Sequence, residues 1–403
     1  MTLAECPPIR YHPGMTILTN SKDVKALCQR LGTAEFITVD TEFLRESTYW
    51  PQLCLIQVAG PEEAACIDPL APEMDLKPFF DLLLNPAIVK VFHAARQDLE
   101  IFDKMMGKLP EPIFDTQVAA MVCGYGDSVG YDNLINQMTG VLIDKSSRFT
   151  DWSRRPLTEK QVEYALADVT HLRVAYTKLR AMLAENGRAA WLAEEMAVLN
   201  DTKTYRVNPN DAWLRIKPRT TKPKFLAILK EVAAWREKEA QSRDLPRGRV
   251  IRDEAMEEIA AHPPTNVEEL SRIRSLSKGW ADGKMGQSLL KAVAKGLATA
   301  PEDAPKLPPK PQLGNYSHAL VELLKVLLRH VCDEANVAPR LIATIGDLEM
   351  IAASDKADTP ALVGWRRELF GEQALALKQG RLALAATKKG KVRLIALEEE
   401  KKS

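Results

Sequence analysis

The nine residues EFITVDTEF, at positions 35–43, join a β-branched apolar run to two carboxylates. Side chains two residues apart on a strand lie on the same face, so Asp40 and Glu42 are expected to project together. Two ionised carboxylates at the end of an apolar strand repel each other and lose hydration, and a divalent cation held by oxygen ligands relieves both costs. The alternative is a strand edge with two solvated acids, which the pair alone leaves open.

Short apolar runs on both sides of this stretch also read as strands. They are bounded by Gly, Pro, Asn and Asp, which is typical of strands. These runs are MTILT (15–19), LCLIQVAG (53–60), AACIDP (64–69) and IVKVFHA (88–94).

After these runs, the apolar spacing becomes helical from Arg96, and IFDTQVAAMV at 113–122 predicts a second helix. A loop-rich region with a short helix is expected over 124–156, and Thr158 is expected to cap a helix that follows it. Strands followed by interleaved helices predict an α/β domain over residues 1–200.

Beyond residue 200 the pattern is almost entirely helical. A polar linker at 201–211 precedes a helical block at 212–297. The segment 298–315 contains five prolines and cannot continue a helix, so it is expected to be a second linker before a block at 316–397. The two blocks are similar in size and internal order, which favours a diverged duplication of one small helical module.

Composition sets limits on the class of protein. The chain has 403 residues, 46% apolar and 27% charged, which is typical of a globular protein with two or three domains. No apolar stretch is long enough for a membrane span, and no secretory signal is visible. Six cysteines are scattered without a C-x-x-C pair, so we expect reduced thiols, a cytoplasmic location, no membrane association and no structural zinc.

A net charge of +1 conceals two halves of opposite sign. Residues 1–200 contain 19 Lys and Arg against 27 Asp and Glu, a net charge of −8. Residues 201–403 contain 36 against 27, a net charge of +9. An acidic half joined to a basic half indicates separate roles, with the basic half a candidate for binding a polyanion.

Two further sets of residues could complete a metal site. Asp98 follows the run IVKVFHA and lies in the first turns of a predicted helix, near the carboxyl edge of the sheet. Tyr164 and Asp168 are four residues apart and share one helical face. The ordinary alternatives are a first-turn acid favoured by the helix dipole for Asp98, and a surface Asp beside a half-buried Tyr for the pair.

Asp40, Glu42, Asp98, Tyr164 and Asp168, in this order, resemble the site residues of the DEDDy branch of the 3′→5′ exonucleases. The sequence around these residues resembles the ribonuclease D family more specifically. In that family such a nuclease is followed by one or two HRDC (helicase and RNase D C-terminal) modules. The stretches that carry it are YWPQLCLIQVA, VFHAARQDLEIF, FDTQVAAMV, YDNLINQMTGVLIDKSSRFTDWSRRPLTEKQVEYALADVTHL and WREKEAQSRDLPRGRVIRDEAMEEIA; GWRRELFGEQALALKQGRLAL is similar to a second HRDC module, less specifically.

The resemblance implies a ribonuclease H-like mixed-sheet exonuclease domain followed by two small helical HRDC bundles. It also implies two divalent cations, Mg²⁺ or Mn²⁺, held by the four carboxylates at the scissile phosphate. Tyr164 would orient the attacking water, because a phenol with a pKa near 10 is a poor base at pH 7. The products would be 5′-mononucleotides released from the 3′ end.

Substrate contacts are expected on both halves of the chain. By position, Glu42, Phe43 and Leu44 would meet the terminal nucleotide, and His93 ends a strand near the site in a supporting role. In the first helical block, 211–297, Lys and Arg number 18 against 12 Asp and Glu. Phosphate contacts without sequence readout are expected there from Lys217, Arg219, Lys222, Lys224, Arg247 and Arg249.

The sequence therefore predicts a metal-dependent 3′→5′ exoribonuclease that trims tRNA precursors and other small structured RNAs with single-stranded 3′ ends, as a monomer. Two alternatives stay open: a 3′→5′ DNA exonuclease of the same chemistry, and a non-catalytic RNA-binding scaffold. The glycines at 124, 126 and 130 do not match the dinucleotide-binding fingerprint, so no nucleotide cofactor is expected.

Overall fold

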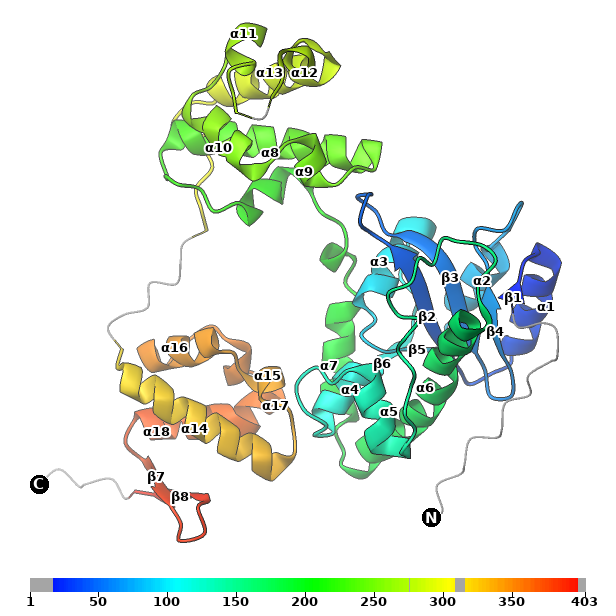
Figure 1. Ribbon diagram of the computed structural model, residues 1–403. Coiled ribbons are helices and arrows are strands. Elements are labelled where there is room, and N and C mark those ends of the chain that lie inside the picture. Colours follow the sequence, from blue (N-terminus) through cyan, green and yellow to red (C-terminus); the bar gives the residue numbers. More distant parts are fainter. Residues whose placement is uncertain (1–16, 275, 309–315, 398–403) are drawn as a thin grey trace, which may run out of the picture.

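The computed structural model describes residues 17–274, 276–308 and 316–397 of the chain. The expectations for residues 15–16, for Cys6 and for positions 309–315 of the proline-rich linker lie outside these residues. Figure 1 shows an α/β part formed by the first half of the chain, and two separate helical blocks formed by the second half. No helix in the described ranges is long and apolar enough to cross a membrane.

The α/β part is built on a mixed six-stranded sheet with the order β1-β4-β3-β2-β5-β6. Strands β2, β3 and β4 are antiparallel neighbours, whereas β5 and β6 run parallel to β2. The strands are β1 (Ile17–Leu18), β2 (Phe36–Leu44), β3 (Gln52–Ala59), β4 (Ala64–Ile67), β5 (Val89–Phe92) and β6 (Ile113–Asp115).

Helices cover both faces of this sheet, which confirms the predicted α/β class. Alternation along β2 turns Ile37 and Val39 towards the apolar cluster shared with α1, α2 and α3. The opposite face, with Thr38, packs against α6, where the Thr38 hydroxyl donates to the Val169 carbonyl at 2.8 Å. The helices are α1 (Ser21–Leu31), α2 (Lys77–Leu83), α3 (Arg96–Met106), α4 (Thr116–Val122), α5 (Tyr131–Thr139), α6 (Glu159–Glu185) and α7 (Ala189–Leu199).

Some local expectations are confirmed and others are wrong. Thr158 caps α6 in a capping box with Gln161, as predicted. Helices α1 and α2 lie in a region where only strands are predicted, so that prediction is wrong there. The signal for α1 is Asn20, whose side chain caps the start of the helix. The segment 113–122 is a strand, β6, followed by a helix, and Asp115 at the junction accepts hydrogen bonds from the backbone of α4.

The polar segment 201–211 is more ordered than a solvated linker. It contains the short 3₁₀ turns η1 (Thr202–Thr204) and the start of η2 (Pro209–Arg215). Tyr205 is buried in the core of the α/β part, and Arg206 pairs with the buried Asp103 at 2.7 Å.

The first helical block has an apolar core of its own. Its long helix α8 packs against η2, α10 and α13, and a Cβ on Gly296 of α13 would lie 2.6 Å from the backbone of α8, so only glycine fits this approach. The helices are α8 (Pro223–Arg243), α9 (Arg247–Val250), α10 (Asp253–Ala261), α11 (Val267–Leu270), α12 (Lys278–Asp282) and α13 (Lys284–Leu297).

The second block is not wholly helical, contrary to expectation. It ends in an antiparallel hairpin, β7 (Leu382–Ala386) and β8 (Val392–Ala396), which packs Leu382, Leu384 and Leu394 against the apolar core of the block. The helices before it are α14 (His318–Ala335), α15 (Pro339–Ile342), α16 (Ile345–Ala353), η3 (Pro360–Leu362), α17 (Gly364–Arg366), η4 (Arg367–Gly371) and α18 (Glu372–Lys378).

The first block contacts the β2–β3 connection through polar groups and through Tyr49 and Trp50, which join its apolar core. The hydroxyl of Tyr49 donates to the buried Glu237 carboxylate, and Arg247 binds the same carboxylate at 2.6 Å. The Arg247 guanidinium also lies 4.7 Å from the centre of the Tyr49 ring. The Asp244 carboxylate accepts from the backbone N–H of Tyr49 at 3.1 Å and of Trp50 at 2.9 Å.

The second block shares one apolar cluster with α4, α5, α6 and α7 of the α/β part. The Trp365 ring stacks on Trp191 at 4.1 Å with an interplanar angle of 8°. Gly124, from the glycine motif of the sequence, has a φ of +83°, and a Cβ there would lie 2.1 Å from the Asn336 side chain. This glycine therefore permits the close approach of the second block.

Candidate active site

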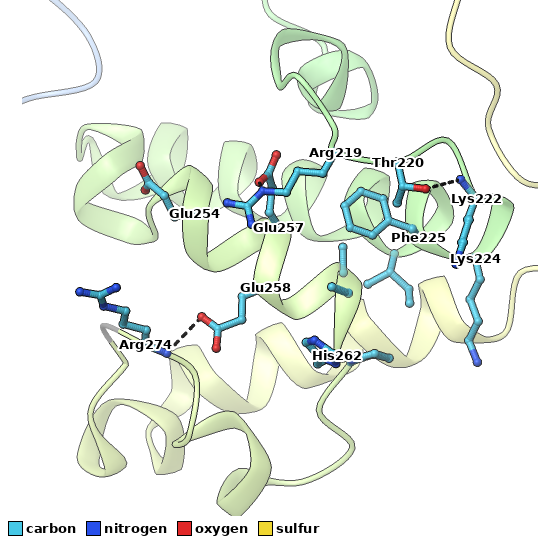
Figure 2. Close-up of a pocket in the computed structure, with 14 residues that line it drawn as sticks. Arg219, Thr220, Lys222, Lys224, Phe225, Glu254, Glu257, Glu258, His262 and Arg274 are labelled. Carbon is cyan, nitrogen blue, oxygen red and sulfur yellow. Dashed lines mark hydrogen bonds and ion pairs between the residues drawn. The ribbon is translucent and has the colours of Figure 1, made fainter.

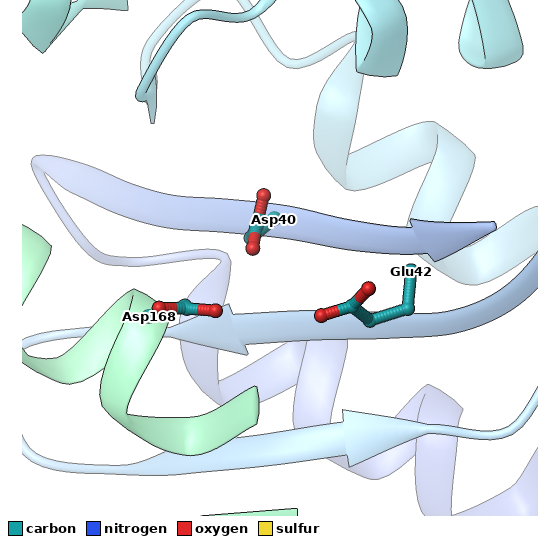
Figure 3. Close-up of side chains that lie close together, drawn as sticks. All are labelled: Asp40, Glu42 and Asp168. Atoms are coloured by element: carbon teal, nitrogen blue, oxygen red, sulfur yellow. The ribbon is translucent and has the colours of Figure 1, made fainter. Parts of the chain in front are cut away.

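Three carboxylates converge at the centre of the sheet. Asp40 and Glu42 extend from β2 and Asp168 extends from α6, as Figure 3 shows. One oxygen from each lies within 4.8 Å of the others, and the three form a group that could hold a metal ion.

Local folding rules explain this convergence. Thr38, Asp40 and Glu42 alternate onto the sheet face covered by α6, and the register shift between Glu42 and Phe43 comes directly after the second acid. The Thr158 cap fixes the start of α6, so Asp168 lies two to three turns into the helix, opposite β2. The order of strand and helix therefore sets the positions of all three acids.

The site is costly for negative charge. Burial, together with the nearby Asp168 charge, holds the pKa of Asp40 well above its ordinary value. Burial and the neighbouring carboxylates raise the pKa of Glu42 to about 10. Burial raises the pKa of Asp168 to about 7, although a hydrogen bond from the Tyr164 hydroxyl and the charge of Arg148 act in the opposite direction.

The pKa values of these three carboxylates stay raised although the charge of Arg148 lowers those of Glu42 and Asp168, so the group needs further positive charge to be ionised. Only oxygen ligands are present in the group of three, which is the donor set that Mg²⁺ and Mn²⁺ prefer. The residues present therefore fit a divalent cation.

Asp98 lies outside this group of three. It is buried in the first turn of α3, and its Oδ1 accepts a hydrogen bond from the Thr41 hydroxyl at 2.5 Å. Burial, with the charge of Asp40 next in size, holds the pKa of Asp98 well above its ordinary value. The structure thus places Asp98 within electrostatic reach of Asp40 and ties it to β2 through Thr41, a partner that the sequence analysis did not identify.

Tyr164 lies one turn before Asp168 on α6. Its ring is 6.0 Å from that of the buried Trp152, which fixes the phenol beside the acids. Burial and the carboxylates raise its pKa, so the hydroxyl stays protonated. A protonated phenol is a hydrogen-bond donor at this position.

His93 follows β5 and is half-buried. Its Nδ1 lies 3.0 Å from the Thr116 hydroxyl, which itself donates to the Phe92 carbonyl, so Nδ1 carries the proton. Burial lowers the pKa of the ring, and its Nε2 has no hydrogen-bond partner among the described residues.

Phe43 and Leu44 point to different faces of the sheet. Leu44 packs in the cluster that contains Trp152 and Tyr164, whereas Phe43 packs against the cluster of α1, α2 and α3. Both side chains are half-buried. The two side chains therefore cannot both face the same terminal base. Leu44 is the one on the side of Tyr164.

Arg148 is a site residue that the sequence analysis did not single out. Its charge lowers the pKa of both Glu42 and Asp168, so it lies near the acids although it is exposed. The segment KSSRFTDW precedes α6, but nothing in its spacing indicates that Arg148 faces the acids.

Five of the six predicted phosphate-binding cations are exposed, and these five fall into two groups. Arg219, Lys222 and Lys224 line a cavity of about 800 Å³ between the start of α8 and α10, with Phe225 and His262 in its wall (Figure 2). Lys217 and Arg249 are exposed elsewhere on the block. Arg247 is committed to Glu237 and Tyr49 instead, so it belongs to the contact between domains and is not among the exposed cations.

Comparisons with known proteins agree with this architecture. A family model described as "3'-5' exonuclease" matches residues 15–184, and one described as "HRDC domain" matches residues 225–293. The chain is 54% identical to a "Ribonuclease D" of Nitrobacter hamburgensis over 94% of this chain and 99% of the relative. It is 51% identical to a "Ribonuclease D" of Granulibacter bethesdensis over 92% of this chain and 94% of the relative.

Among solved structures, the chain is similar to Escherichia coli RNase D, described as "an exoribonuclease involved in structured RNA processing". The TM-score is 0.76 at 30% identity, covering 91% of this chain and 99% of that one.

Proposed function

The chain belongs to the ribonuclease D family and is a 3′→5′ exoribonuclease, and from that premise we propose which of its residues perform the reaction and on which RNAs. The observation that carries the proposal is the convergence of Asp40, Glu42 and Asp168 within 4.8 Å.

We propose that Asp40, Glu42 and Asp168 hold divalent cations, with Asp98 as the fourth acid. The raised pKa values of these groups support this, because buried carboxylates without a positive charge are unfavourable. Two cations, Mg²⁺ or Mn²⁺, would supply an activated water nucleophile and stabilise the leaving 3′-oxygen.

The remaining roles belong to the chain itself. Tyr164 keeps its proton, so it donates a hydrogen bond that orients the water and does not act as the base. Thr41 holds the Asp98 carboxylate by a short hydrogen bond. Leu44 contacts the terminal nucleotide from the Tyr164 side, with Glu42 next to it and Phe43 behind the strand. His93 supports the site from the end of β5, where the hydrogen bond between its Nδ1 and the Thr116 hydroxyl fixes the ring.

The first helical block binds the body of the RNA. Lys217, Lys222 and Lys224 are exposed and form no ion pair within the described ranges, whereas Arg219 lies 2.5 Å from Glu257. Such cations contact phosphates without reading sequence and make affinity dependent on salt. Arg249 extends the same block, so a structured RNA can be held there while its 3′ end reaches the acids.

The substrates we propose are tRNA precursors and other small structured RNAs with single-stranded 3′ ends. We propose a monomer that acts in the cytoplasm, in keeping with five described cysteines that are all buried and unpaired. A DNA exonuclease of the same chemistry is the alternative, since the carboxylates would serve either backbone.

The test uses a 3′-extended tRNA precursor and its DNA analogue, each labelled at the 5′ end, with Mg²⁺, Mn²⁺ or EDTA. We expect a metal-dependent ladder that shortens from the 3′ end on RNA, with Asp40→Asn slower by at least about a thousandfold. Asp81→Asn is the matched control, because Asp81 is an acid in an exposed pair with Lys77. Equal trimming of DNA would favour the alternative, and binding without trimming would contradict a catalytic role for the acids.

A further inference from the structure

Phe149 is an exposed aromatic side chain beside the active site. Its exposed fraction is 91%, the largest among the exposed large apolar side chains of the described residues. It lies in the segment 140–157 between α5 and α6. A single exposed apolar residue is common on protein surfaces, so exposure alone gives no function.

The turn that carries Phe149 is anchored on both sides. Ser147 and Trp152 are buried, and the Thr150 hydroxyl donates to the Ser147 carbonyl at 2.7 Å. The Gln161 amide of α6 donates to the Thr150 hydroxyl at 3.0 Å. These hydrogen bonds hold the loop turn at 147–150 against the first helical turn of α6. The exposed side chains of Arg148 and Phe149 therefore extend from an anchored backbone.

This anchoring places the turn next to the catalytic centre. Gln161 and Tyr164 are three residues apart and share a helical face, and Trp152 lies 6.0 Å from the Tyr164 ring. The Arg148 guanidinium is 5.2 Å from the centre of the Phe149 ring. Arg148 forms no ion pair within the described ranges, although its charge reaches the acids Glu42 and Asp168.

A free cation and an exposed ring side by side match the two repeating features of a nucleic acid strand. The phosphate is an anion, and every unpaired base offers a flat face for stacking. A double-stranded end offers the phosphate but keeps its bases stacked within the helix. The pair therefore fits the single-stranded RNA that lies 5′ of the scissile bond and extends away from the catalytic acids.

We propose that Arg148 and Phe149 form a subsite for the RNA immediately 5′ of the scissile bond, in which Phe149 stacks on an unpaired base and Arg148 neutralises a backbone phosphate. The subsite rests on the proposed exoribonuclease site and assigns to Arg148 and Phe149 the recognition of the single strand upstream of the terminal nucleotide.

The experiment measures kcat/KM for release of the first nucleotide from single-stranded RNAs. One set carries a single abasic ribose at the second, third or fourth position from the 3′ end. For the wild type, one of these positions is expected to lower kcat/KM by about 5- to 100-fold, which is the range of base–aromatic stacking. Phe149→Ala is expected to lower kcat/KM on the intact RNA to a similar degree. For this variant, the abasic ribose at that position is expected to cause no further decrease in kcat/KM.

Two variants serve as controls. Phe149→Trp is expected to restore dependence on the same base, because the indole stacks at least as well. Leu142→Ala, at a side chain that is 83% exposed on the same segment, is expected to keep the wild-type profile. Thermal unfolding of each variant checks that truncation of an exposed side chain leaves the fold intact.

The subsite is overturned if no abasic position couples to Phe149, or if Leu142→Ala changes the profile as much as Phe149→Ala does. The 5′-p-nitrophenyl ester of uridine monophosphate separates this outcome from failure of the proposed function. It presents a terminal nucleotide with no upstream base, so metal-dependent hydrolysis by the wild type shows that the acids are catalytic whether or not the subsite exists. Absence of that hydrolysis would contradict the proposed function itself.

Discussion

The two helical blocks begin with the same succession of elements. In each, a long helix is followed by a four-residue helix and then by a nine-residue helix: α8, α9 and α10 in the first, α14, α15 and α16 in the second. Each long helix ends at a left-handed residue, Asp244 with a φ of 51° and Asn336 with a φ of 50°. The side chains of both residues hydrogen-bond to the backbone of the α/β part, so equivalent corners of the two blocks face it.

The contacts around these corners differ in kind. The first block is joined to the α/β part by polar contacts at the Tyr49–Glu237–Arg247 group, and of the α/β part only Tyr49 and Trp50 enter the apolar core of the block, among the described residues. The second block merges its apolar core with that of the α/β part through the stacked Trp191 and Trp365. The two blocks therefore attach to the α/β part in different ways although they share a succession of helices.

Removing the apolar contact of the second block is expected to have the largest effect on stability. Trp365→Ala removes a buried ring and its stack on Trp191, and should lower the free energy of unfolding by about 3–5 kcal/mol. Denaturant unfolding measures this, with Val363→Ala as the control because Val363 is 64% exposed. Equal losses in the two variants would mean that the second block is not anchored by its core.

Breaking the polar contact of the first block should cost less. Glu237→Gln leaves the Arg247 guanidinium beside a neutral amide, and we expect a loss of about 1–3 kcal/mol. Glu239 lies two residues after Glu237 and forms a more exposed ion pair with Arg243. Glu239→Gln should therefore change stability by less than about 0.5 kcal/mol. A loss for Glu237→Gln as large as that for Trp365→Ala would remove the contrast between the two interfaces.

The sequence predicts those features that depend on local order. The alternation in EFITVDTEF places Asp40 and Glu42 on one face, and the Thr158 cap fixes the helix that carries Asp168. Both follow from spacing along a single element, so neither requires knowledge of the tertiary fold.

The features that the sequence does not predict depend on distant partners. Arg247 reads as a surface cation in a basic cluster, but Glu237 and Tyr49 bind it. Arg148 and Thr41 acquire their positions only when α3, α6 and β2 are brought together. The β7–β8 hairpin lies in a block predicted to be helical, and its two strands pair only with each other, so the helical pattern before them gives no sign of it.

The charge on the two blocks provides a third test. Lys217→Gln, Lys222→Gln and Lys224→Gln together should weaken binding of a tRNA precursor by about tenfold and reduce the slope of log affinity against log salt by about 2. The matched set in the second block is Lys388→Gln, Lys389→Gln and Lys391→Gln, around the hairpin turn. Residues 316–397 contain 12 Lys and Arg against 9 Asp and Glu, a smaller excess, so we expect a smaller change in slope. Equal changes would mean that both blocks share the RNA.

The smallest expected effect is an opposite response of the two interfaces to pH. Burial raises the pKa of Glu237, but hydrogen bonds from Arg247 and Tyr49 outweigh it, so the pKa is lowered overall. Glu237 therefore stabilises the fold above its unfolded pKa, near about 4.3, and this contribution is lost as the pH falls through the folded value. At Glu195, burial outweighs the nearby Arg366 and raises the pKa, so its contribution is favourable at low pH and is lost as the pH rises through the folded value.

Thermal unfolding of Glu237→Gln, Glu195→Gln and the wild type between pH 4 and pH 7 separates these two responses. As the pH falls, the stability advantage of the wild type over Glu237→Gln should shrink, while its stability relative to Glu195→Gln should rise. At pH 7 Glu195→Gln should lie within about 1 kcal/mol of the wild type, since Glu194 still pairs with Arg366 at 3.1 Å. Because both differences are taken against the same wild type, acid unfolding of the rest of the chain cancels. If both differences moved in the same direction, the two interfaces would have the same electrostatic character, and the contrast between a polar and an apolar contact would rest on the tryptophan stack alone.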